Sequence, residues 1–415
     1  MVKNVNKLLP LIILYFCTVK SIYLGFILLC FYVAFLGIFQ KKVWDVNLLP
    51  ILPFISLNIL LLILGVISIK APFPSVKDIL RDVVNFIFPS LALLAGYFSF
   101  TTYNYFVAPE CNRTFGENLL LRSVALCGII SILVQAYELI AYKADNIKMD
   151  TLRTYRDTVG TGFDATLFAL LLFFLVFQDV PKRKIYRYSF CLICLISVFV
   201  SFSRINLVVL IVSTITMLFV SKKVKLKPIV VAIIILMMLF LIIPSGIRES
   251  FLAKTLNSFS EIRSSSNNFV TWADINNNWR GYEKYTVKSV MENAGIGRMF
   301  TGFGLGARLP LPFSINLGGS LLSAIPTIHT SYYYVFFKCG YLGLVCYLGM
   351  LITILENGIK SNSNVVRNVL IILFILVSLK GYTEGGIIGS QTSLLAMFTY
   401  GVFLHRTTAK KNEFS

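Results

Sequence analysis

The sequence predicts an all-α polytopic membrane protein with about twelve transmembrane helices. Hydrophobic residues make up 57% of the 415 residues, and the mean hydropathy is +0.78. A soluble domain of this length cannot bury so much apolar surface, because part of every soluble fold must face water. Apolar runs of roughly 20 residues, the length that crosses a bilayer core as a helix, recur along almost the whole chain between short polar breaks. Together these observations predict the fold class.

Clusters of Lys and Arg orient the expected helices. The net charge is +19, and much of it follows directly after apolar runs, at Lys41 and Lys42 and within residues 182–187 and 222–227. Such clusters mark the cytoplasmic ends of spans and predict membrane lipids with anionic headgroups as partners. No nucleic acid is expected, because a protein that binds it carries its charge on one exposed face.

The expected spans alternate in direction from a cytoplasmic N-terminus to a cytoplasmic tail. The first two form a tight hairpin, and an exterior loop covers residues 143–163. In order, the spans are expected at residues 8–19, 22–39, 48–69, 83–100, 119–142, 165–177, 189–203, 205–220, 228–243, 339–355, 369–379 and 391–404.

A long polar stretch divides the chain. The apolar pattern stops at residues 244–328, where Asn, Ser, Gly, Trp and charged residues predominate. The span order places this loop outside, and a loop of such length in a compact protein is usually functional or disordered. Three parts follow: residues 1–243 with nine spans, the large exterior loop 244–328, and residues 329–415 with three spans and the tail.

Arginines at the exterior face form the first candidate site residues. Arg204 follows Ser203 between two apolar helices, where a charge needs water, a partner or a ligand. The structural alternative is an Arg that reaches the lipid headgroups. Arg153 and Arg156 lie in the loop 143–163, and an Arg fork binds phosphate or carboxylate bidentately. The alternative for them is a solvated basic loop.

The large loop contains an expected amphipathic helix that begins with Arg280. Apolar side chains recur at helical spacing from Tyr285 to Met291, which predicts a helix lying on the membrane. A glycine-rich run follows at residues 302–306. It lacks the strand–turn–helix context of a dinucleotide site.

His329 stands where the large loop re-enters the membrane. The chain has only two His, and His405 is interpreted as an interface residue beside Arg406. A His near a helix N-terminus feels the positive end of the helix dipole, which favours the neutral imidazole that can accept a proton. The structural alternative is a boundary His without a chemical role.

These features, in this order, resemble the bacterial O-antigen ligase and O-antigen polymerase superfamily over about residues 153–355. The sharpest likeness is the pattern His-x-Ser-Tyr followed by Gly-x-Leu-Gly, found at residues 329–332 and 340–343. Arg280 matches an Arg that opens a periplasmic helix in the family, and Tyr285 stands where members often have Trp.

The resemblance also includes the family's Gly-x-Gly-x-Gly turn, matched at residues 302–306, and its Ser-Arg pair after a span, matched at Ser203 and Arg204. It implies a GT-C-like fold in the bacterial inner membrane with an active site that faces the periplasm.

The activity implied by the resemblance is that of a metal-independent, inverting glycosyltransferase without a cofactor. Its donor would be an oligosaccharide linked to undecaprenyl diphosphate, and its acceptor a sugar hydroxyl. His329 would be the general base. The sequence offers no Asp-x-Asp motif or His/Cys cluster for a metal. The resemblance implies that Arg204, Arg280, Arg156 and Arg153 bind the diphosphate and that Glu283, Tyr285, Ser331 and Tyr332 bind substrate.

Several functions remain open on the sequence. The leading one is a polymerase that transfers a lipid-linked chain onto a new lipid-linked repeat unit, favoured by a composition rich in Phe, Ile, Asn and Lys that is common among products of low-GC polysaccharide gene clusters. A ligase that attaches glycan to lipid A core would use the same His and Arg residues. A flippase or transporter would need charges along several spans, whereas nearly all charges here lie at span ends. The resemblance also suggests a chain-length regulator as a partner.

Overall fold

The computed structural model is almost entirely helical in the part of the chain that it describes. The expected first span, residues 8–19, and residues 145–162 of the exterior loop lie outside that part. The described residues are 22–39, 47–104, 112–144, 163–177, 183–221, 226–242, 278–317, 320–388 and 391–412, with short pieces at 245–246, 248–249, 251–253, 255 and 275.

Among the described residues, three segments are long and apolar enough to cross a membrane, and several shorter apolar helices accompany them. The three are Val76–Phe98, Ser331–Ile359 and Asn364–Thr383. These helices support a polytopic membrane protein, while the number of twelve spans stays a prediction. The helices of the bundle are α2 (Ile22–Phe39), α3 (Leu52–Ile67), α4 (Val76–Asn104), α5 (Asn112–Ala144), α7 (Phe163–Leu171) with the π-helical turn η3 (Leu172–Val176), α8 (Lys184–Val200), α9 (Arg204–Val220), α10 (Leu226–Ile242), α15 (Ser331–Ile359), α16 (Asn364–Thr383) and α17 (Gln391–Asn412).

Helices α4 and α15 are among those that begin earlier than the sequence predicted. Helix α4 was expected from residue 83 and α15 from residue 339, because charged residues interrupt the apolar runs there. In the structure two of these charges pair with each other: the Lys338 ammonium lies 2.6 Å from the Asp82 carboxylate, and both side chains are buried. A buried charge is tolerated when it has a partner of opposite sign. The pairing lets both helices continue past their charged residues.

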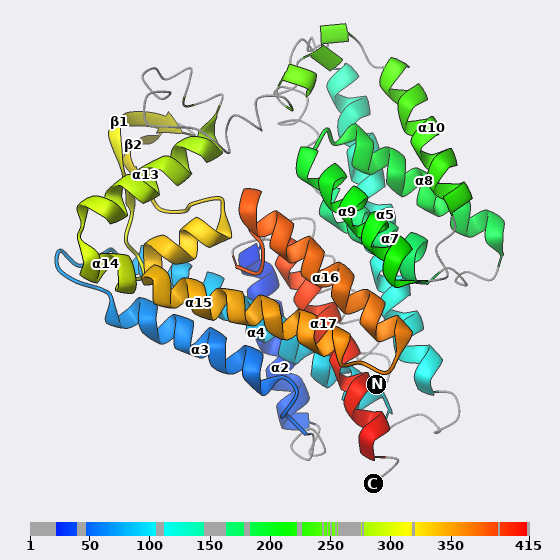
Figure 1. Ribbon diagram of the computed structural model, residues 1–415, viewed down its shortest axis with the longest axis horizontal. Helices are drawn as coiled ribbons and strands as arrows, with labels where there is room; N and C mark the ends of the chain where they lie inside the picture. Colours follow the sequence, from blue (N-terminus) through cyan, green and yellow to red (C-terminus); the bar gives the residue numbers. More distant parts are fainter. Residues whose placement is uncertain are drawn as a thin grey trace.

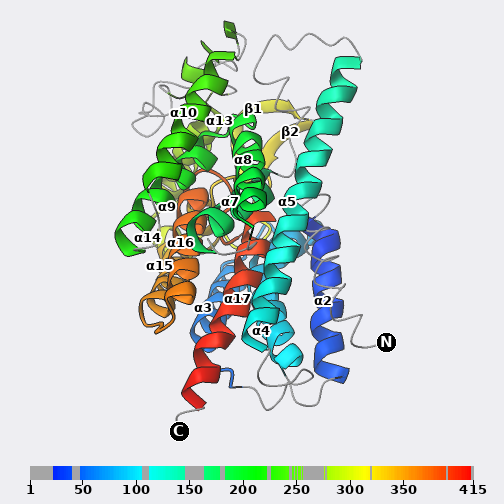
Figure 2. The same ribbon diagram turned by 90° about the vertical axis from the view of Figure 1, so that its right-hand side faces the viewer.

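Helix α15 lies between α3 and α16, and α17 packs along α4 (Figures 1 and 2). Glycines permit the close approach of α17 to α4. A Cβ atom at Gly96 would lie 2.0 Å from the carbonyl oxygen of Phe398, and one at Gly401 would lie 2.2 Å from that of Leu93. The two backbones therefore meet with no room for a side chain.

The large loop carries four elements next to the start of α15 (Figure 1). Helix α13 (Trp279–Asn293) confirms the helix predicted at Arg280, and its placement on a membrane surface stays a prediction. Helix α14 (Ile296–Thr301) follows. Strands β1 (Leu309–Leu317) and β2 (Ser320–Ile325) form an antiparallel hairpin that the sequence analysis did not predict. We call the end of the bundle where α3 ends and α15 begins the site end.

Residues 302–306, the glycine segment, join α14 to the bundle at the site end. The N–H groups of Phe303 and Gly304 donate to the carbonyls of Phe337 and Lys338, each at 2.9 Å. Those carbonyls are available because Gly340 has non-helical dihedral angles (φ 64°, ψ −163°) and interrupts α15. The glycine pattern of the sequence therefore serves a backbone junction.

Only glycine fits at this junction. Gly302 and Gly340 both have positive φ, 77° and 64°. A Cβ atom at Gly302 would lie 2.4 Å from the carbonyl of Lys338, and one at Gly340 would lie 2.3 Å from the carbonyl carbon of Phe300. Both the dihedral angles and the space exclude a side chain.

Candidate active site

The site is organised around a pair formed by Glu283 and His329. Glu283 belongs to α13, and His329 lies two residues before α15. The Nδ1 atom of His329 is 2.7 Å from the Glu283 Oε1 atom, and the backbone N–H of His329 donates to Oε2 at 3.1 Å. The Glu283 side chain is completely buried, whereas that of His329 is 59% exposed. The buried carboxylate therefore holds the imidazole at Nδ1, while the rest of the ring is largely exposed.

The hydrogen bonds determine which imidazole nitrogen is available. A carboxylate accepts, so His329 carries its proton on Nδ1 when it is neutral. Within the described residues nothing hydrogen-bonds to Nε2. Trp279 donates from its indole nitrogen to Glu283 Oε1 at 2.8 Å and helps to fix the carboxylate. Nε2 is thus the atom that can accept a proton from a substrate.

The pKa of His329 is raised above its ordinary value, chiefly by the hydrogen bond to Glu283. Burial and the charge of Arg280 lower the pKa, and the charges of Glu283 and Glu384 raise it. The sequence analysis expected the helix dipole to favour the neutral imidazole. That expectation is wrong in direction, because the carboxylate outweighs the opposing effects and makes His329 a stronger base.

Arg280 lies beside this pair and begins a series of alternating charges. One terminal nitrogen of Arg280 is 3.1 Å from Glu384 Oε1, and both side chains are 30% exposed. The other carboxylate oxygen of Glu384 is 3.6 Å from the ammonium of Lys380. Lys380 is fully buried and also pairs with Asp164 of α7. We call Arg280, Glu384, Lys380 and Asp164 the charge series.

Of the other three predicted arginines, the structure describes only Arg204. Arg204 is the first residue of α9, half-buried, and α9 packs against α16, the helix that ends just before Glu384. Arg153 and Arg156 lie outside the described residues. The structure therefore places Arg280 near His329. The roles of all four arginines stay predictions.

Two of the expected substrate contacts are buried in the structure. Glu283 has no exposed surface and is committed to His329. The hydroxyl of Ser331 is buried, donates to the carbonyl of Ile388 at 2.9 Å and accepts from the N–H of Gly386 at 2.7 Å. The resemblance implied that both side chains bind substrate, and that role stays a prediction.

Tyr332 and Tyr285, the other two expected contacts, are half-buried. The Tyr332 hydroxyl donates to the carbonyl of Ser378 at 3.2 Å, and its ring lines a cavity of about 620 Å³. The cavity lies between α13, α14, α15 and α16, and its lining residue Tyr332 is three residues along the chain from His329. Five of its thirteen lining residues are aromatic. The lining residues are Lys288, Met291, Glu292, Met299, Tyr332, Tyr333, Phe336, Tyr341, Leu344, Leu348, Ser378, Leu379 and Tyr382.

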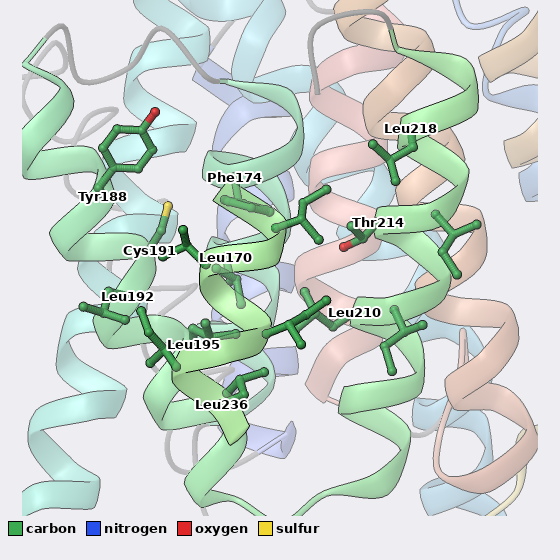
Figure 3. Close-up of a pocket in the computed structure, with 16 residues that line it drawn as sticks. Leu170, Phe174, Tyr188, Cys191, Leu192, Leu195, Leu210, Thr214, Leu218 and Leu236 are labelled. Atoms are coloured by element: carbon green, nitrogen blue, oxygen red, sulfur yellow. The ribbon is translucent and has the colours of Figure 1, made fainter. Parts of the chain in front are cut away.

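A second cavity of about 630 Å³ lies among α7, α8, α9 and α10. Figure 3 shows Phe174, Leu195 and Leu210 around it, and almost its entire wall is apolar. None of the predicted site residues lines it. Its wall carries little polar surface, so the candidate site stays at His329.

The described residues contain no group of three or more His, Cys, Asp and Glu side chains arranged to hold a metal ion. The polar groups at the site end are instead arranged as a carboxylate–imidazole pair and a series of ion pairs. Such an arrangement suits proton transfer and the binding of an anion.

The structure is that of a helical protein suited to a membrane, in which a His paired with a carboxylate lies near an Arg at one end of the helix bundle. Residues 189–348 match the family model described as O-antigen ligase, which confirms the predicted resemblance. Enzymes of this type act as glycosyltransferases in surface polysaccharide synthesis, with lipid-linked glycans as substrates. The match includes Arg204, Arg280 and His329, while Arg153 and Arg156 precede it. No curated protein matches the chain at a significant level.

Sequence reasoning missed Glu384 and Lys380. A signal was present, because Lys380 directly follows an apolar run and Glu384 stands four residues later, the spacing at which helical side chains meet. An ionisable residue at the end of a span is a candidate for function.

Proposed function

We propose that this protein is an O-antigen or related surface polysaccharide polymerase of the bacterial inner membrane. It transfers a glycan from undecaprenyl diphosphate to a sugar hydroxyl of a new lipid-linked repeat unit. The observation that carries the proposal is the Glu283–His329 pair beside Arg280, inside the region that matches the family.

The mechanism uses these three side chains in defined roles. Glu283 holds the Nδ1–H group of His329, and Nε2 takes the proton of the acceptor hydroxyl as its oxygen attacks the anomeric carbon. The bond between that carbon and the diphosphate oxygen breaks, and the diphosphate leaves with the electron pair. A positioned base of this kind contributes roughly 10² to 10⁴ in rate. Arg280 stabilises the growing negative charge, and a single displacement inverts the anomeric centre without a metal.

The cavity that Tyr332 lines, three residues along the chain from His329, supports a role in binding a lipid-linked glycan. Rings of Tyr332, Tyr333 and Tyr382 offer flat apolar faces for a sugar or a prenyl chain. Lys284 lies 3.7 Å from the centre of the Tyr382 ring and Lys288 belongs to the lining, so cations stand at the rim. Arg204, Arg153 and Arg156 are further candidates for the diphosphate, and Tyr285 for the glycan.

The positive-inside pattern supports a periplasmic location of the site end. The cluster at residues 182–187 precedes and begins α8, and the cluster at residues 222–227 follows α9. The hairpin between α8 and α9 carries Arg204 at the opposite end, so Arg204 faces the periplasm in this topology. We retain twelve spans and a GT-C-like architecture as part of the proposal.

A ligase that attaches finished glycan to lipid A core is the second candidate, because the matching family model carries that description. It would use the same base and the same arginine. The resemblance suggests a chain-length regulator as a partner, and binding of such a protein would favour the polymerase.

Glycan profiling of a deletion strain tests the proposal. Loss of a polymerase leaves lipid A core that bears one repeat unit, whereas loss of a ligase leaves core without any. Complementation with His329→Ala should give the deletion profile with normal amounts of protein in the membrane. His405→Ala, at the only other His of the chain, is the matched control and should restore the wild-type profile. Long-chain product from the His329 variant would refute the base role.

A further inference from the structure

The charge series connects three parts of the fold at the candidate site. Arg280 comes from α13, Glu384 follows α16, Lys380 lies in the last turn of α16, and Asp164 begins α7. Neighbouring members alternate in sign, and each lies within ion-pair distance of the next.

Lys380 is the fixed point of this series. Its ammonium has no exposed surface, and a buried charge without partners is strongly unfavourable. Two carboxylates, those of Asp164 and Glu384, compensate it. The ion pair with the buried Lys380 ammonium therefore holds the Glu384 carboxylate in position.

Glu384 is held on its backbone as well as on both carboxylate oxygens. It is the C-cap of α16, and its N–H donates to the carbonyl of Lys380 at 2.7 Å. Its Oε2 atom faces Lys380 and its Oε1 atom faces Arg280. Few degrees of freedom remain for its side chain, so it can serve as a rigid support.

Arg280 uses one terminal nitrogen for this support. A guanidinium has five N–H donors in a planar fork, and within the described residues the other donors of Arg280 have no hydrogen-bond partner. The side chain is 30% exposed. A guanidinium anchored at one corner can present its remaining donors to an anion in one orientation.

We propose that Glu384 is a positioning residue, anchored by Lys380 and Asp164, that orients the Arg280 guanidinium toward the diphosphate of the lipid-linked donor. This inference rests on the proposed function. It assigns Glu384 a role through Arg280, without contact to the substrate.

Glu384→Gln removes the charge and keeps the size of the side chain. The variant should bind undecaprenyl diphosphate about tenfold more weakly, the smaller effect of losing a hydrogen bond to a charged group. Binding is measured with purified protein in nanodiscs by quenching of tryptophan fluorescence, since Trp279 adjoins Arg280. In turnover assays the KM for the donor should rise more than kcat falls.

The pH dependence of kcat/KM is a second measurement, and it would not change if Glu384 had a purely structural role. The charged groups that act on His329 are Glu283 and Arg280 from α13 and Glu384 from the segment after α16. Because Glu384 raises the pKa of His329, Glu384→Gln should move the acid limb of kcat/KM to lower pH. Glu384→Asp keeps the charge and should retain most of the wild-type limb.

Glu356→Gln is the matched control, because Glu356 also pairs with a Lys four residues away but lies near the other end of α15. It should leave affinity and pH profile unchanged. If the wild-type protein shows no activity with pure lipid-linked repeat units, the proposed polymerase function itself is refuted. Active wild type together with unchanged donor affinity and unchanged pH limb in Glu384→Gln would overturn the positioning role. Equal losses of thermal stability and activity, with the KM unchanged, would also overturn it.

Discussion

Glu283→Gln is the sharpest test of the chemistry, because it changes the charge beneath His329 and little else. Glu283 accepts from His329 Nδ1 at 2.7 Å, from Trp279 at 2.8 Å and from the His329 backbone at 3.1 Å. Gln has one acceptor oxygen, so its NH₂ group must face a donor. A hydrogen bond to a charged group contributes about 1.5–3 kcal/mol, and tenfold in rate corresponds to about 1.4 kcal/mol. The expected fall in kcat/KM is therefore about 10- to 150-fold.

The pH dependence gives the sign of the effect. A general base works when it is unprotonated, so activity rises with pH through the pKa of His329. Glu283 raises that pKa, and its replacement by Gln should move the acid limb to lower pH. The assay follows polymer length from purified lipid-linked repeat units over a pH series.

The double variant Glu283→Gln/His329→Ala completes the test. If Glu283 acts only through the imidazole, it should be no slower than His329→Ala alone. A further loss in the double variant, or an acid limb that moves to higher pH in Glu283→Gln, would refute the assigned role.

Three further changes probe the cation, the backbone junction and the buried ion pair. Arg280→Lys keeps the charge but not the fork and should lower kcat/KM about tenfold; near-normal transfer would argue against bidentate binding. Gly340→Ala places a Cβ atom 2.3 Å from the carbonyl carbon of Phe300 and should lower thermal stability in detergent by about 1–3 kcal/mol or more. The control is Gly349→Ala on the same helix, whose Cβ atom would meet only the flexible Leu57 side chain and should lower stability less. Lys338→Met leaves the Asp82 carboxylate without its ammonium and should destabilise the protein by about 3–5 kcal/mol, and adding Asp82→Asn should restore part of that stability.

Apolar runs were sufficient to locate most helices, but they located helix ends only where polar residues coincide with those ends. Helix α9 is such a case: it spans Arg204–Val220 against an expected 205–220, because polar residues lie at both of its ends. Helices α4 and α15 extend further than expected, since Asp82 and Lys338 compensate each other across the bundle. Such a pairing joins residues that are distant in the chain, and no local pattern reveals it.

The candidate site was predictable in its most unusual residues. His329 stood out at a predicted membrane boundary and Arg280 at the start of a predicted amphipathic helix, and the structure places the two near each other. Glu283 and Ser331 were named as substrate contacts, and the structure shows both of them buried and hydrogen-bonded within the protein. Whether a polar side chain faces substrate or supports a neighbour depends on tertiary packing, which the sequence does not show.

Helix α13 carries both sides of the proposed chemistry. Arg280 and Glu283 are three residues apart and therefore share one face of the helix. Arg280 reaches Glu384 just beyond α16, while Glu283 reaches His329 just before α15. The spacing between the cation and the partner of the base is thus set by the helix itself, and their placement is set by the ends of two bundle helices. Because α14 links α13 to the glycine segment, which is hydrogen-bonded to the interrupted α15, a shift at Gly340 should move base and cation together.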